Sequence, residues 1–196
     1  MDAEHAVPRP IDAAEARALA SALVDILLDA VNGGASVHFL RPLSRDKALA
    51  FWLDIAVKVE RGERALFAAF QDGRLVGTVQ LLLDQPENQP HRAEIGKMMV
   101  HGAARRQGLG ARLMQTAETA AWSLGKTLLV LDTATGGDAE RLYARLGWTR
   151  VGVIPDYALD GDGALCGSTW FYKRLAPPVV ERLGPISTGD VHAPNR

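Results

Sequence analysis

Four segments of the chain repeat apolar residues at the three- and four-residue spacing of a helix. The first is followed by Asn32-Gly33-Gly34, and glycine readily adopts the backbone conformation that ends a helix. Ser44 is a suitable N-cap for the second, since its hydroxyl can accept a hydrogen bond from a free backbone N–H. The expected helices run from Asp12 to Val31, from Ser44 to Gly62, from about Gln107 to Leu124 and from Ala139 to Leu146.

Apolar runs between these helices predict strands. Asp72-Gly73 separates two of the runs and is a typical hairpin turn. The run Thr127–Thr133 is apolar on both faces and follows a helix, which favours a buried strand reached by a right-handed βαβ crossover. The order ααβββαβαββ predicts an α/β (α+β) fold. The expected strands cover Ala65–Phe70, Arg74–Leu83, Ala93–Val100, Thr127–Thr133, Trp148–Ile154 and Thr169–Leu175.

The composition is that of a folded, soluble protein. Of the 196 residues 47% are hydrophobic and 23% are charged, which excludes collagen-like, coiled-coil and largely disordered chains. The formal net charge of -1 gives no overall field that would attract nucleic acid or an anionic membrane, so neither partner is expected. The single Cys166 cannot form an internal disulfide, and the chain has no secretory or membrane-spanning apolar run. We expect a cytoplasmic monomer or homo-oligomer, such as a homodimer.

The length fits one domain, which we expect over residues 1–176. Pro177-Pro178 opens a segment with proline, glycine and polar residues, which is typical of a loosely held end. Residues 177–196 are therefore expected to form a C-terminal tail.

A basic turn with two glycines lies between the strand that ends at Val100 and the next helix. In Arg105-Arg106-Gln107-Gly108-Leu109-Gly110, free backbone N–H groups and the positive end of a helix dipole face whatever lies in front of the helix. Glycine lets phosphate oxygens approach main-chain nitrogens, and Arg105 or Arg106 can add a charge-assisted hydrogen bond. The turn is a candidate phosphate site, and a solvated glycine-rich turn is the alternative.

Two other phosphate-binding motifs compete for this turn. A dinucleotide-binding fold could place Asp132 on a ribose, but Leu113 replaces the third glycine and an antiparallel hairpin precedes the unit. A P-loop is excluded because no Gly-Lys-Ser/Thr sequence follows. A dinucleotide-binding protein is the less favoured alternative.

Three motifs follow one another in a set order: Lys97-Met98-Met99-Val100 on a strand, the turn at 105–110, and Leu142-Tyr143-Ala144-Arg145-Leu146-Gly147-Trp148 on a later helix. This order resembles the GNAT superfamily of acetyl-CoA-dependent acyltransferases over about residues 10–176. The resemblance implies a mixed, mostly antiparallel central sheet flanked by helices. It also implies acetyl-CoA as cosubstrate and no metal.

The resemblance assigns the cofactor to particular residues. The pantetheine arm would pair with the main chain of Met98, Met99 and Val100, as an added strand pairs with a sheet edge. Many relatives carry an asparagine that contacts the cofactor where this chain has Gly136. The pyrophosphate would lie on Arg105, Arg106, Gln107, Gly108, Leu109 and Gly110.

A nearer resemblance is to the tabtoxin-resistance acetyltransferases. It implies an acceptor that is a β-lactam amino acid toxin of the tabtoxinine type, acetylated on its hydroxyl, and hence a role in antibiotic or toxin resistance. Because related folds acetylate amines, the sequence leaves open whether a hydroxyl or an amine is acetylated. The resemblance is carried by Gly33-Gly34-Ala35-Ser36-Val37, Arg92-Ala93-Glu94, Leu131-Asp132-Thr133 and Thr149-Arg150-Val151-Gly152.

Three side chains are candidates for the chemistry of acetyl transfer, which must deprotonate the acceptor and stabilise the departing thiolate. The resemblance implies that the Tyr143 hydroxyl points at the cofactor sulfur as general acid, the alternative being a core aromatic residue. Asp132 stands at the carboxyl end of a predicted buried strand, the place where open sheets bind ligands, which favours a site role. The alternative is that its side chain caps a helix or turn. Glu94 is a general base if burial raises its pKa, or a solvated strand-edge residue. Either carboxylate can be the base, and together they could hold a cationic amine.

The loop Gly33–Leu40 lies where the superfamily builds its acceptor pocket, so Ser36, His38 and Phe39 are candidate wall residues. His38 could equally satisfy structural hydrogen bonds. The histidines are scattered without metal-ligand spacing, so no metal is expected. The sequence favours direct transfer of an acetyl group from acetyl-CoA to a small polar acceptor. The alternative is a non-catalytic acetyl-CoA-binding or sensing module.

Overall fold

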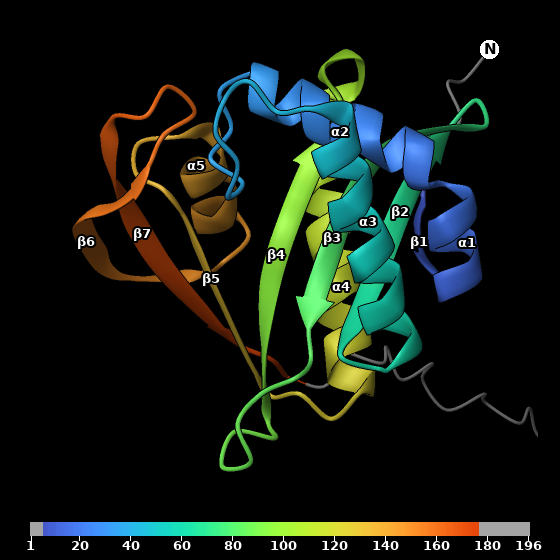
Figure 1. Cartoon of the computed structure of the whole chain (residues 1–196). Helices are drawn as coiled ribbons and strands as arrows, with labels where there is room; N and C mark the ends of the chain where they lie inside the picture. Colours follow the sequence, from blue (N-terminus) through green and yellow to red (C-terminus); the bar gives the residue numbers. More distant parts are fainter. Residues whose placement is uncertain (1–5, 177–196) are drawn as a thin grey trace, which may run out of the picture.

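The computed structural model describes residues 6–176, which contain a seven-stranded sheet with helices on both faces (Figure 1). The spatial order of the strands is β1-β2-β3-β4-β5-β7-β6. Neighbouring strands are antiparallel except β4 and β5, which pair in parallel. The mixed, mostly antiparallel sheet predicted from the sequence is confirmed, and it excludes the doubly wound parallel sheet of a dinucleotide-binding protein.

The strands are β1 (Pro8–Ile11), β2 (Arg64–Gln71), β3 (Arg74–Leu82), β4 (Arg92–Val100), β5 (Leu128–Ala134), β6 (Thr149–Leu159) and β7 (Leu165–Arg174). The helices are α1 (Ala13–Ala18), α2 (Ala20–Asn32), α3 (Arg45–Glu60), the 3-10 turn η1 (Gly102–Ala104), α4 (Leu109–Ser123) and α5 (Asp138–Arg145).

The N-terminal part differs from the expectation in two ways. The single helix expected from Asp12 to Val31 is divided at Leu19 into α1 and α2. The edge strand β1 was not expected, because its four residues include two prolines, and proline is tolerated only at a sheet edge. The predicted tail, residues 177–196, lies outside the described residues.

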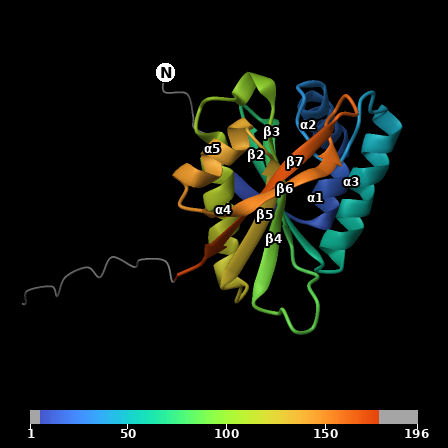
Figure 2. The same cartoon turned by 90° about the vertical axis from the view of Figure 1, so that its left-hand side faces the viewer.

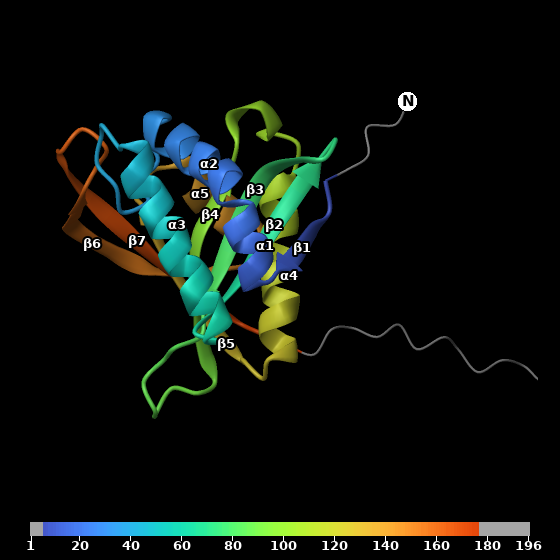
Figure 3. The same cartoon turned by 45° about the vertical axis from the view of Figure 1, so that its right-hand side comes forward.

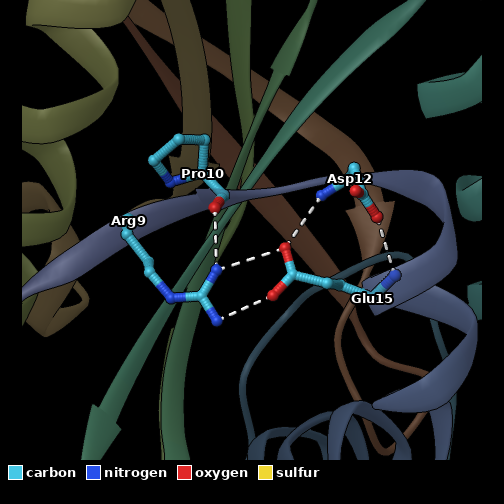
Figure 4. Close-up of polar contacts among 4 residues, drawn as sticks. All are labelled: Arg9, Pro10, Asp12 and Glu15. Carbon is cyan, nitrogen blue, oxygen red and sulfur yellow. Dashed lines mark hydrogen bonds and ion pairs between the residues drawn. The ribbon is translucent and has the colours of Figure 1, made fainter.

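The start of α1 is joined to β1 by a small polar cluster (Figure 4). The Asp12 side chain accepts from the backbone N–H of Glu15 at 2.8 Å, and the Glu15 carboxylate accepts from the backbone N–H of Asp12 at 3.4 Å. This reciprocal pair is a capping box. The guanidinium of Arg9 on β1 also donates to both Glu15 oxygens, at 2.8 and 3.2 Å. The Glu15 carboxylate therefore connects β1 to the start of α1.

The sheet separates two apolar layers, with α1, α2 and α3 on one face and α4 and α5 on the other (Figure 2). Alternation along β2 shows how the layers arise. Leu66 and Ala68 pack toward α2 and α3, whereas Phe67 and Ala69 pack in the layer of α4. We call these the α2–α3 face and the α4 face.

The segment 33–44 between α2 and α3 passes along one end of the sheet toward β6 and β7 (Figures 1 and 3). Arg41 fixes this crossing. Its backbone N–H donates to the carbonyl of Gly161 at 2.9 Å, and its guanidinium pairs with Asp162 at 2.5 Å, both in the β6–β7 turn. Among residues 6–176, no helix is both long and apolar enough to span a membrane.

Candidate active site

The parallel strands β4 and β5 pair over only three residues and then separate (Figure 1). The last pair is Glu94 with Val130. Beyond Glu94, the edge of β4 that faces β5 pairs with no strand among the described residues. This free edge includes Met98, Met99 and Val100, whose main chain was predicted to pair with pantetheine.

A bulge in β4 lies at this separation. Thr78 pairs with Met99 and Gln80 with Gly96, so two residues of β4 lie opposite one residue of β3. Lys97 is one of the two, and its φ of +49° is unusual for a side chain larger than glycine. Because bulges bend and twist a strand, this one explains how β4 leaves β5 while it stays paired with β3.

A cavity of about 710 Å³ lies against the separated strands. Its wall includes the start of α4, part of α5, the loop after α2 and both strands. The predicted site residues that line it are Ser36, His38, Glu94, Met98, Met99, Val100, Arg105, Arg106, Gly108, Leu109, Gly110, Asp132 and Tyr143. Gln107 and Phe39 do not line it. The Phe39 ring packs edge-on against Phe51, which is itself part of the wall.

The start of α4 has the features of an anion site. Its N-cap, Gly108, has a φ of +76° and no side chain to cap the helix, so within residues 6–176 the first backbone N–H groups of α4 have no side-chain cap. Gly110 serves packing as well, because an added Cβ would lie 3.1 Å from Leu142. Basic side chains surround this part of the wall, including Arg106, Arg141 and Arg145. An uncapped helix start among arginines fits a pyrophosphate.

The guanidinium of Arg105 is already bound within the protein. Its Nε donates to the carbonyl of Val100 at 2.9 Å, and its Nη2 donates to Asp29 Oδ2 at 2.9 Å. The same Asp29 oxygen accepts from the backbone N–H of Gly102, also at 2.9 Å. Asp29 therefore ties the turn before α4 to the end of α2. Arg106, in contrast, is exposed and pairs with Asp138 at the start of α5, at 2.9 Å.

Tyr143 approaches the separated strands from the α4 face. Its ring belongs to the apolar layer of α4 and packs against Trp148 and Phe171, with centroids 6.1 and 5.9 Å away. The residue is only 5% exposed and lines the cavity. Within residues 6–176 its hydroxyl has no hydrogen-bond partner. Burial, and then the Asp132 carboxylate, raise the pKa of Tyr143 well above its usual value, so the hydroxyl is a neutral donor.

The two carboxylates lie on the other face of the sheet. Glu94 and Val130 are paired, so Asp132, two residues beyond Val130, shares the face of Glu94. Ser168 of β7 donates to Asp132 Oδ2 at 2.6 Å and so orients it. Burial, and then the negative charge of Asp132, raise the pKa of Glu94 above its usual value. The separation of β4 and β5 thus joins a tyrosine on one face to two carboxylates on the other.

His38, in the loop after α2, and Lys97, on β4, are in contact within the cavity wall, with 3.0 Å between the ammonium Nζ and the ring Nδ1. Desolvation, and then the Lys97 charge, lower the pKa of His38, so its neutral ring accepts from the ammonium. Burial, and then the Arg64 charge, lower the pKa of Lys97 to about 8. Among the described residues, no cluster of His, Cys, Asp or Glu side chains suits a metal ion.

Among the polar side chains of the wall that the sequence analysis did not predict as site residues are Arg64, Gln80, Lys97 and Ser168. Two of them, Arg64 and Gln80, could be identified from the register in which β2, β3 and β4 pair. Arg64 pairs with Leu82, which pairs with Glu94, so all three side chains share the α2–α3 face. Gln80 pairs with Gly96 and lies on the same face.

The model of the Acetyltransferase (GNAT) family matches residues 35–148, more than half of the chain. The chain therefore belongs to the GNAT acetyltransferase family, as the sequence motifs implied. It is an acetyl-CoA-dependent acetyltransferase, with acetyl-CoA as cosubstrate, and the alternative of a non-catalytic binding module is not supported.

Solved structures share this fold. An N-acetyltransferase from Staphylococcus aureus Mu50 is 18% identical, with a TM-score of 0.73 over 88% of this chain and 100% of its own. YncA from Salmonella typhimurium, solved with its cofactor acetyl-CoA, is 21% identical, with a TM-score of 0.71 over 89% of this chain and 96% of its own. A ribosomal-protein-alanine N-acetyltransferase from Brucella melitensis is 20% identical, with a TM-score of 0.69 over 86% and 99%.

Proposed function

We propose that the protein transfers an acetyl group from acetyl-CoA directly to a hydroxyl or amine of a small polar molecule, with Glu94 as general base. The observation that carries this proposal is the arrangement of Tyr143 and the two carboxylates on opposite faces of the sheet, where β4 and β5 separate. In this arrangement the cosubstrate approaches from the side of α4 and the acceptor from the α2–α3 face.

Glu94 is a better base than Asp132 for a physical reason. A base works best when its pKa approaches the operating pH, and burial together with the neighbouring Asp132 charge moves the pKa of Glu94 in that direction. Asp132 accepts a hydrogen bond from Ser168, which holds it in place as a negative charge beside Glu94. Asp132 thereby stabilises a positive charge that develops on an acceptor amine.

Tyr143 is the donor for the leaving sulfur. When bound, acetyl-CoA supplies an acetyl group activated as a thioester. The acceptor proton passes to Glu94, the acceptor oxygen or nitrogen takes the acetyl group, and the Tyr143 hydroxyl donates a hydrogen bond to the thiolate that leaves. The N–H groups at the start of α4, with Arg106, Arg141 and Arg145 nearby, hold the phosphates.

A small acceptor suits a cavity of about 710 Å³ that the cosubstrate would also occupy. The segment 33–44 contributes Ser36, Val37 and His38 to the cavity wall, and Arg41 fixes it to the β6–β7 turn, so a fixed loop borders the acceptor side. The nearer resemblance implies a small acceptor of this kind, a β-lactam amino acid toxin of the tabtoxinine type. Toxin resistance, a cytoplasmic location and a homodimer stay predictions from the sequence.

The experiment is a thiol-release assay with acetyl-CoA and a panel of amines, amino acids and hydroxylated β-lactams, with the products identified by mass spectrometry. We expect acceptor-dependent thiol release and an acetylated product from at least one class. Calorimetry with acetyl-CoA provides the control that the cosubstrate binds. Tight acetyl-CoA binding without acceptor-dependent release from any small molecule would overturn the proposal of a small acceptor.

A further inference from the structure

Arg64 is a half-buried cation of the cavity wall that forms no ion pair within the described residues. It is half-buried at the start of β2, and no carboxylate within residues 6–176 lies at ion-pair distance from it. Its only hydrogen bond there is from Nη1 to Gln80 Oε1, at 3.2 Å. Since a guanidinium has five donor hydrogens in a planar fork, most of its capacity is left for a ligand.

Gln80 adds a buried donor beside Arg64. The residue is 0% exposed, and its Nε2 is buried without a hydrogen-bond partner among the described residues. Because Arg64 holds the amide oxygen, the amide nitrogen is the free end. A buried amide group without a partner is costly, so an unpartnered N–H donor in a residue of the cavity wall indicates an acceptor atom that arrives with a ligand.

Lys97 supplies a second cation on the same wall. Its ammonium contacts the neutral ring nitrogen of His38 and lies 5.8 Å from the centre of the Phe51 ring. No carboxylate among residues 6–176 lies at ion-pair distance from it. The left-handed backbone of the bulge holds Lys97 in this place, and backbone strain of this kind is found chiefly at functional sites.

We propose that Arg64, Gln80 and Lys97 form an anion subsite that holds a carboxylate of the acceptor, and that the acceptor is therefore a small carboxylic acid such as an amino acid. The inference rests on the proposed function and specifies its substrate class. The fork of Arg64 and the Gln80 amide match the two oxygens of a planar carboxylate, and Lys97 adds charge. Glu94 and Asp132, on the same face of the sheet, remain for the nucleophile.

The charges of this wall also match such a ligand. Among the charged side chains of the wall, neither Arg64 nor Lys97 forms an ion pair with Glu94 or Asp132, although both cations lower the pKa of Glu94. If the cations served only to neutralise these carboxylates, direct pairs would be expected across so short a span of the sheet. A wall that presents both cations and carboxylates instead suits a molecule with a carboxylate at one end and an amine or hydroxyl at the other.

The test compares amino acids with their own carboxamides as acceptors in the thiol-release assay. The specificity ratio is kcat/KM for the acid divided by kcat/KM for the amide. Loss of the carboxylate charge lowers the pKa of the neighbouring amine, so the amide has more free amine and the comparison works against the proposal. We expect wild type to prefer the acid, and Arg64→Met or Lys97→Met to lower the ratio by about 10- to 100-fold.

Arg74→Met is the matched control, because Arg74 is exposed at the start of β3 and does not line the cavity. Its ratio should equal that of wild type. A wild-type ratio near one, or the same ratio in wild type and both cavity variants, would overturn the anion subsite while acetylation itself stands. If Arg64→Met does not fold, Lys97→Met and the wild-type ratio decide. No thiol release with amino acids or their amides, beside release with another acceptor of the panel, would also overturn the inference while the proposed function stands. No release with any acceptor of the panel would reject the proposed function, and the inference with it.

Discussion

Replacing Tyr143 with phenylalanine should separate catalysis from stability, because turnover is expected to fall while the free energy of unfolding does not. The ring packs against Trp148 and Phe171, and phenylalanine keeps those contacts. The hydroxyl has no hydrogen-bond partner among the described residues, so its removal breaks no bond within the protein. A fully buried hydroxyl without a partner costs about 1 to 3 kcal/mol. Tyr143 lines a cavity that admits water, so we expect an unchanged or slightly higher free energy of unfolding.

The loss in turnover follows from the pKa values of the donor and the leaving group. A thiol has a pKa of about 8.5, and tyrosine has one of about 10 before burial raises it further. Full proton transfer from Tyr143 to the thiolate is therefore uphill by more than about 2 kcal/mol. A hydrogen bond to the charged sulfur is the more favourable role, and such bonds contribute about 1.5 to 3 kcal/mol. Tyr143→Phe should then lower kcat by about 10- to 150-fold.

The measurement is thiol release at saturating acetyl-CoA, together with calorimetric Kd values and urea unfolding. Tyr172→Phe is the matched control, because Tyr172 lies on β7 and is not part of the cavity wall. It should keep wild-type kcat. A Tyr143→Phe protein with kcat within twofold of wild type would assign the tyrosine to packing. A fall in kcat accompanied by a loss of unfolding free energy as large as the increase in activation free energy would also refute the reasoning.

Three further predictions concern the neighbouring groups. Because burial and Asp132 raise the pKa of Glu94, kcat/KM should fall as the pH drops through that raised pKa. Glu94→Gln should remove both this fall at acidic pH and most of the turnover, and an unchanged fall at acidic pH would assign the base to another residue. Lys97 has its pKa lowered to about 8, so kcat/KM for a carboxylate acceptor should decline above that pH, and Lys97→Arg should move the decline upward; coincident profiles would contradict this. Asp29→Asn should weaken acetyl-CoA binding by about two- to tenfold, because the charged hydrogen bond to Arg105 is lost, and should leave the acceptor KM unchanged. The same acetyl-CoA Kd for variant and wild type by calorimetry would show that this hydrogen bond does not support cosubstrate binding.

The parts of the fold that follow from local chemistry could be predicted from the sequence. Ser44 caps α3 and accepts from the backbone N–H of Lys47, as its hydroxyl and position indicate. The hairpin at Asp72-Gly73 and the glycine turn before α4 likewise depend on a few adjacent residues. The break at Leu19 and the pairing of β1 were not predictable in this way, because both depend on contacts with distant parts of the chain.

Site residues that belong to a local sequence motif were predicted, whereas those that reach the site only through strand pairing were missed. Tyr143, Glu94 and Asp132 stand in recognisable segments, whereas Arg64 and Gln80 join them only through the register of β2, β3 and β4. The tie between Arg105 and Asp29 spans two distant helical regions, so sequence reasoning left Arg105 free for phosphate. Contacts of this kind have no local signal.

The bulge in β4 shows why alternation alone misassigns this strand. Before the bulge, Ala93 and Ile95 pack in the layer of α4, so Glu94 points to the α2–α3 face. After it, Met99 packs in the layer of α2 and α3, so odd positions have exchanged faces with even ones. One extra residue thus lets a single strand direct a carboxylate and, five positions later, an apolar side chain to the same face. The same extra residue places Lys97 at the exchange point, where it enters the cavity.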